Sequence, residues 1–126
     1  MTSPLETAVP STPADIEATM LENLQQMVGD MAADMVAELA PLFVEDAKSN
    51  LKEIYKALKE GDTATADKVC HTLKGSSANM GLQVLSQISA AVMMAARQNN
   101  LDEARKLWPR LIAEFEQVRK VLAKYS

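Results

Sequence analysis

The sequence has very few of the residues that cross-link a fold or bind metal. Cysteine and histidine occur once each in 126 residues, as Cys70 and His71. A single cysteine excludes an intramolecular disulfide and fits a reducing compartment. One histidine with one cysteine gives no credible ligand set for zinc or haem, and no acidic cluster is suited to holding Mg²⁺. We therefore expect a chain without a metal or other cofactor of its own.

Aromatic residues and glycine are also scarce. Aromatics make up 4% of the chain and glycine numbers 4, against 8 methionines and 48% hydrophobic residues. Strands favour valine, isoleucine, threonine and aromatics more than this composition provides. A chain of this length forms one domain whose core is large enough to fold without disulfides or metal. The composition predicts an all-α protein.

Excess positive charge and long apolar runs are missing as well. The formal net charge is -4, so neither nucleic acid nor an anionic membrane is expected as a partner. No basic segment precedes an apolar run at the N-terminus, and no stretch approaches the ~20 apolar residues of a membrane span. We expect a cytoplasmic protein. Residues 1–13 carry three prolines among serine and threonine, which predicts a flexible N-terminal tail before a folded domain at 14–126.

Apolar residues recur at spacings of three and four through most of the remaining chain, which is typical of amphipathic helices. Pro41 should kink or split the longest of these segments. Gly61 and Asp62 form a helix stop followed by a cap. Connections of two or three residues force neighbouring helices to run antiparallel. We expect an up-and-down four-helix bundle with an additional N-terminal helix, its helices at about 14–28, 31–60, 63–80, 83–98 and 101–124.

The only histidine lies in the predicted helix at 63–80, one turn before a glycine. A glycine inside a helix costs about 1 kcal/mol relative to alanine. On a helical wheel the positions within roughly 60° of Ala66 form the core stripe: Val69, Cys70, Leu73, Ser77 and Met80. His71 then points away from the core. Its neighbours on that face are small or basic: Ala64, Gly75 and Ala78 around it, with Lys68 and Lys74 on either side.

A lone histidine is usually an incidental core or surface residue, but here the wheel disfavours the core. An incidental surface histidine explains neither the glycine nor the ring of small side chains. An exposed imidazole is a nucleophile, and its attack on a phosphoryl group forms a phosphoramidate with about two negative charges. Lys74 would offset part of that charge, and Gly75 would leave room for a partner's active site. Without a phosphate-binding glycine loop, the chain could receive a phosphoryl group but not generate one.

The stretch from His71 to Gly81, HTLKGSSANMG, resembles the signature of histidine-containing phosphotransfer (HPt) domains, and the resemblance extends over about residues 14–125. It implies a relay in multistep two-component signalling. Such a domain accepts a phosphoryl group from the aspartate of a receiver domain, often in a hybrid sensor kinase, and passes it to a response-regulator receiver domain. His71 would be the phosphorylated residue, Lys74 its electrostatic support and Gly75 the clearance for docking. Mg²⁺ would belong to the partner receiver domain, and the chain would be a monomer without ATP-dependent kinase activity. Its starting methionine and short tail suggest a stand-alone bacterial HPt protein.

Many HPt relatives carry Gln or Glu on the following helix near the histidine, where this chain has Met93 or Met94. Two interpretations of that helix remain open. Its methionines and alanines are either core, or a soft hydrophobic patch suited to docking more than one receiver. In the second case the docking residues would lie on three helices: Ile16, Met20, Met27, Ala64, Lys68, Ala78, Ala90 and Met94. The alternative function is a non-catalytic helical adaptor or decoy that binds receiver domains without phosphotransfer.

Overall fold

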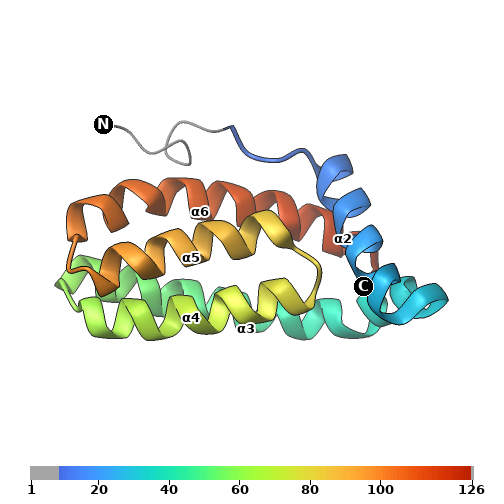
Figure 1. Cartoon of the computed structure of the whole chain (residues 1–126), viewed down its shortest axis with the longest axis horizontal. Coiled ribbons are helices and arrows are strands. Elements are labelled where there is room, and N and C mark those ends of the chain that lie inside the picture. Colours follow the sequence, from blue (N-terminus) through green and yellow to red (C-terminus); the bar gives the residue numbers. More distant parts are fainter. Residues whose placement is uncertain (1–8, 126) are drawn as a thin grey trace.

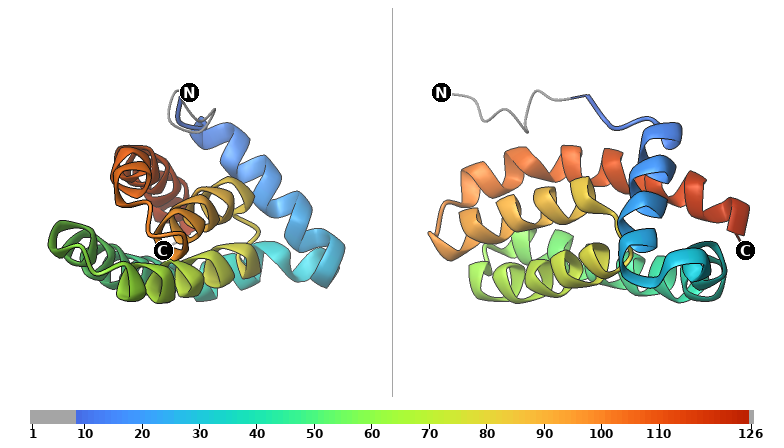
Figure 2. Two further views of the ribbon diagram at one scale, coloured as in Figure 1. Left: turned by 60° about the vertical axis from the view of Figure 1, so that its left-hand side comes forward. Right: turned by 45° about the vertical axis from the view of Figure 1, so that its right-hand side comes forward.

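A computed structural model describes residues 9–125. Within that range the chain is helical and has no strand: α2 (Pro13–Val28), η1 (Gly29–Met31), α3 (Ala32–Glu60), α4 (Thr63–Asn79), α5 (Gln83–Arg97), α6 (Leu101–Leu122) and η2 (Ala123–Tyr125). Helices α3 to α6 run side by side in alternating directions, and α2 lies across one end of them (Figures 1 and 2). The expected all-α, antiparallel four-helix bundle with an additional N-terminal helix is confirmed.

The turn between α3 and α4 forms as its local chemistry predicts. Gly61 adopts the left-handed conformation, with φ at 76°, and its N–H bonds to the carbonyl of Ala57. The Asp62 carboxylate then accepts a hydrogen bond from the backbone N–H of Thr65 at 3.0 Å. The glycine ends one helix and the aspartate caps the next. A two-residue link of this kind turns α4 back along α3.

Of the two outcomes expected at Pro41, a kink or a split, the split does not occur. The helix continues from Ala32 to Glu60 with the proline inside it. The proline removes one backbone hydrogen bond, the one to the carbonyl of Ala37. Both residues are exposed, so water can bind that carbonyl. Ala40 and Phe43 on either side of the proline are buried, and their packing holds the helix together.

Helix α4 buries the stripe that the helical wheel predicts. Each of its members is at most 7% exposed: Ala66, Val69, Cys70, Leu73, Ser77 and Met80. Burial, assisted by the nearby charge of Asp67, raises the pKa of the Cys70 thiol to about 12. The thiol therefore stays protonated and packs as a small apolar group. The opposite face of α4 is left free to point outward.

Helix α2 packs tightly on the turn that joins α4 to α5. Gly81 has φ at +75°, and a Cβ there would lie 2.7 Å from the backbone oxygen of Met20. The Asn23 side chain donates a hydrogen bond to the carbonyl of Gly81 at 3.1 Å. Ile16 is 7% exposed and Met20 is 0% exposed. Their predicted place in an exposed docking patch is wrong, because the apolar face of α2 covers the end of the bundle.

The segment expected to form the N-terminal tail contacts the bundle near its C-terminal end. Residues 1–8 of the predicted 1–13 segment lie outside the described residues. The backbone N–H of Ser11 donates a hydrogen bond to the Glu114 carboxylate on α6 at 3.0 Å, which ties this residue to the bundle. None of the helices within residues 9–125 is long and apolar enough to cross a membrane.

Glu17 links α2 to the C-terminal end of the chain. Its carboxylate accepts hydrogen bonds from the Tyr125 hydroxyl at 2.6 Å and from the Lys124 ammonium at 3.1 Å. These two bonds lower the pKa of Glu17. A carboxyl with a lowered pKa in the folded state stabilises the fold above its unfolded pKa of about 4.3. That stability is lost as the pH falls through the folded value.

We therefore expect the melting temperature to fall more steeply in the wild type than in Glu17→Gln between about pH 5 and pH 3. Thermal unfolding followed by circular dichroism across this range measures the difference. Glu22→Gln, at an exposed position on the same helix, is the matched control and should follow the wild type. Parallel curves for wild type and Glu17→Gln would contradict the assignment.

Candidate functional site

Helix α4 presents His71 on the face opposite its buried stripe. His71, Gly75 and Ala78 are exposed along this face, as are Ala64 and Lys68, and Lys74 is half-buried. The structure thus places these residues on the outward surface, as the helical wheel predicts. His71, Gly75 and Ala78 lie at spacings of four and three, so they follow one another along the helix surface.

Nothing in the fold requires a glycine at position 75. A Cβ built there would meet no atom within 4 Å, and Gly75 is absent from the glycines with positive φ in the described chain. The residue lies in the middle of α4, where glycine costs about 1 kcal/mol relative to alanine. The free protein therefore gains nothing in packing from the missing side chain, and clearance for a docking partner stays a prediction.

Helix α5 lies beside α4 and is fixed to it close to the histidine. The Ser86 hydroxyl donates a hydrogen bond to the backbone carbonyl of Lys74 at 2.9 Å. Met93 is 4% exposed and belongs to the core, whereas Met94 is 42% exposed and Ala90 is half-buried. Of the two methionines considered for the place of the relatives' polar residue, only Met94 points outward.

One exposed residue of α2 lies close to the face of α4 that carries His71. Met27 is 61% exposed at the last turn of α2. It lines an open hollow together with Ala78 of α4 and Ser86 and Gln87 of α5. The structure therefore places Met27 beside Ala78, which belongs to the exposed row of His71, Gly75 and Ala78 on α4. That these residues contact a partner stays a prediction, as it does for Ala64, Lys68, Ala90 and Met94.

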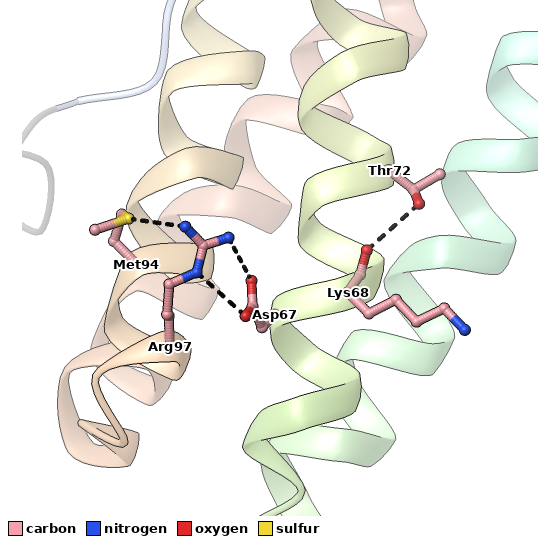
Figure 3. A network of polar contacts seen from close by, with 5 residues as sticks. All are labelled: Asp67, Lys68, Thr72, Met94 and Arg97. Atoms are coloured by element: carbon pink, nitrogen blue, oxygen red, sulfur yellow. Dashed lines mark hydrogen bonds and ion pairs between the residues drawn. The ribbon is translucent and has the colours of Figure 1, made fainter.

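Two charged residues beside the histidine, Asp67 and Arg97, are not among the site residues predicted from the sequence. His71, Asp67 and Arg97 line one open hollow, together with Ala64, Lys68 and Thr72. The Arg97 guanidinium binds the Asp67 carboxylate through two hydrogen bonds, Nε to Oδ2 at 3.3 Å and Nη2 to Oδ1 at 3.1 Å. Its Nη1 lies 3.9 Å from the sulfur of Met94 (Figure 3). The spacing of four between Asp67 and His71 was a usable signal, but the partnership with α5 depends on how the helices pack.

The site combines one exposed imidazole with two lysines and a carboxylate that is paired with an arginine, on an open helical surface. Within residues 9–125, no three histidine, cysteine, aspartate or glutamate side chains gather where they could hold a metal ion. An open face of this kind has no enclosed pocket for a small substrate. Its chemistry is that of a nucleophile that a second protein can reach and cover.

A helical bundle that displays one histidine nucleophile in this way fits a class of proteins that receive a group and pass it on. The chain belongs to the Hpt domain family, whose model matches residues 38–121.

Two curated relatives and one solved structure are similar to this chain. The phosphorelay intermediate protein rdeA of Dictyostelium discoideum is 25% identical over 89 residues, which cover 71% of this chain and 35% of the relative. Histidine-containing phosphotransfer protein 1 of Oryza sativa subsp. japonica is 28% identical over 100 residues, 78% of this chain and 68% of the relative. The chain thus spans about a third of the first relative's length and about two thirds of the second's. The crystal structure of histidine-containing phosphotransfer protein B (HptB) from Pseudomonas aeruginosa PAO1 superposes with a TM-score of 0.71 at 28% identity, covering 83% of this chain and 88% of that one.

Proposed function

We propose that this protein is a phosphorelay intermediate that carries a phosphoryl group on His71. It accepts the group from the phosphorylated aspartate of a receiver domain in a sensor kinase, hybrid kinases included, and passes it to the receiver domain of a response regulator. The observation that carries this proposal is the exposed His71 one turn before Gly75, a glycine for which the fold has no need. Membership of the Hpt domain family supports the same role.

The transfer is a substitution at phosphorus. A ring nitrogen of His71 attacks, the N–P bond forms, and the P–O bond to the aspartate breaks so that the carboxylate leaves with its electron pair. The reverse sequence hands the group to the next aspartate. Lys74, at i+3 on the same helix, offsets part of the two negative charges on the phosphohistidine. Gly75 leaves the space through which the partner's active site approaches.

Everything else that the reaction needs comes from the partner. The chain has no nucleotide-binding glycine loop, so it acts as a carrier without ATP-dependent kinase activity of its own. Mg²⁺ enters with the receiver domain. The protein works as a cytoplasmic monomer, and its docking face includes Met27, Ala78 and Met94, which are exposed around the histidine. Flexible methionine side chains suit a docking surface that adapts to more than one partner.

Incubation with radiolabelled, phosphorylated receiver domains tests the proposal. The wild type should acquire phosphate that is labile in acid and stable in base, and His71→Gln should acquire none above background. Because His71 is exposed, the variant should keep the wild-type circular dichroism spectrum and melting temperature. A wild type that binds receiver domains without taking up label would instead be an adaptor or decoy.

A further inference from the structure

Asp67 is the acidic residue nearest in sequence to the histidine, and it lies on the same side of α4. It precedes His71 by four residues, and residues at this spacing on a helix have Cβ atoms about 5–6 Å apart. Asp67 and His71 also line the same open hollow. The Asp67 carboxylate in this position therefore interacts electrostatically with any charged group attached to the His71 imidazole.

A free carboxylate there would oppose phosphorylation. The phosphohistidine of the proposed function carries about two negative charges, as a phosphate monoester does. By Coulomb's law, one further negative charge about 6 Å away in water disfavours that state by a factor of about three to ten, and more where solvent is displaced. The repulsion acts only on the phosphorylated state, so it would shift the transfer equilibrium back toward the receiver aspartate.

Arg97 removes this opposing charge. Its two hydrogen bonds to Asp67 form the paired contact of a guanidinium with a carboxylate, and the sulfur of Met94 borders the same group (Figure 3). Arg97 is the one charged residue in the sequence of α5. From α4, the other charged groups on this side are the two lysines, Lys68 and Lys74. Asp67 is the one acidic residue among those that line the hollow with His71, so with Asp67 paired this hollow is neutral or positive.

We propose that Arg97 sets the phosphorylation equilibrium of His71 by neutralising Asp67. This inference rests on the proposed function and deepens it, because it makes Arg97 a residue that acts on His71 through another side chain. The transfer itself is unchanged: the phosphoryl group moves between the receiver aspartate and His71, and no further reactant is needed. The Asp67–Arg97 pair determines how much of the phosphoryl group His71 holds at equilibrium.

The test measures how label partitions between a phosphorylated receiver domain and an equal amount of the full chain, at low ionic strength. Arg97→Gln should lower the ratio of labelled His71 to labelled receiver by about three- to tenfold. The double variant Asp67→Asn with Arg97→Gln should return the ratio to the wild-type value, since it removes both charges. The deficit of Arg97→Gln should shrink in about 1 M salt, where the Debye length is about 3 Å.

Arg119→Gln is the matched control, because it breaks an exposed arginine–glutamate pair on α6 and should leave the ratio unchanged. A wild-type ratio in Arg97→Gln, or a double variant as low as Arg97→Gln, would overturn the inference while the proposed function stands. A wild type that takes up no label would overturn the proposed function, and the inference with it. Because both charged residues are partly exposed, all variants should melt near the wild-type temperature.

Discussion

Glu114→Ala is expected to lower the free energy of unfolding by about 3–5 kcal/mol. Glu114 lies on α6 with its side chain 1% exposed, and it pairs at 2.9 Å with Arg110, whose side chain is 6% exposed. Removing the glutamate leaves a buried guanidinium without a counter-charge. Since small domains are stable by only about 5–15 kcal/mol, this is a large share of the total. Urea denaturation followed by circular dichroism at 25 °C measures it.

The same substitution also releases the segment that precedes α2. The Glu114 oxygen that binds Arg110 also accepts the hydrogen bond from the backbone N–H of Ser11 at 3.0 Å. Its other carboxylate oxygen and the Arg110 Nε have no hydrogen-bond partner within the described residues. The pair is thus deeply buried yet only partly satisfied. Replacing both partners by apolar residues of similar size is therefore expected to cost little, or even to stabilise the protein.

Two variants separate burial from charge pairing in this experiment. Glu116→Ala breaks an exposed pair with Arg119 on the same helix, and its cost should stay under about 1 kcal/mol. Arg110→Met combined with Glu114→Leu should recover most of the loss seen in Glu114→Ala. Equal effects of Glu114→Ala and Glu116→Ala would show that the buried pair contributes no more than a surface one.

The parts of the fold that depend on local chemistry could be predicted from the sequence. The buried stripe of α4 follows from a period of 3.6 residues, and the turn at Gly61 and Asp62 follows from backbone conformation and capping. Pro41 does not split α3, because one lost hydrogen bond is outweighed by tertiary packing of the residues beside it. The burial of Met20 was missed because an apolar helix face does not reveal what it packs against.

The candidate site shows the same difference between local features, which the sequence predicts, and contacts between helices, which it does not. His71, Lys74 and Gly75 lie on one helix, so their spacing was enough to place them together on its outer face. The partnership of Asp67 with Arg97 joins residues 30 apart in sequence. It depends on how α5 is set against α4, which the hydrogen bond of Ser86 to α4 helps to fix. No periodic pattern within one helix encodes that relationship.

Gly75→Gln is expected to slow phosphoryl transfer from a receiver domain by about a hundredfold while making the free protein more stable. Misplacing reacting groups by about 1 Å costs a rate factor of this size. The stability should rise by roughly 0.5–1 kcal/mol, since glutamine favours the helix more than glycine does. Rapid-quench measurement of labelled His71 gives the rate, and urea denaturation gives the stability.

The transfer rate is expected to fall while the stability rises because the surroundings of Gly75 differ between the free and the bound protein. In the free protein a side chain there enters open space, because no atom lies within 4 Å of the Cβ position. Once a receiver domain covers His71, one helical turn away, that space must hold the partner's surface. A glutamine then either clashes or holds the donor aspartate away from the imidazole. A substitution that damaged the fold would lower both quantities together.

Two further variants separate the effect of filling the space at position 75 from a general effect of adding a side chain to a helix. Gly75→Ala adds one methyl group and should transfer at a rate between those of the wild type and Gly75→Gln, while gaining about 1 kcal/mol of stability. Ser49→Gln, at an exposed position on α3, adds a similar side chain to another helix and should transfer normally. If Gly75→Gln transferred at the wild-type rate, the glycine would have no role in docking. Its cost to the helix would then lack an explanation in the free or the bound state. Loss of transfer with a gain in stability is therefore the result that ties Gly75 to the approach of the partner.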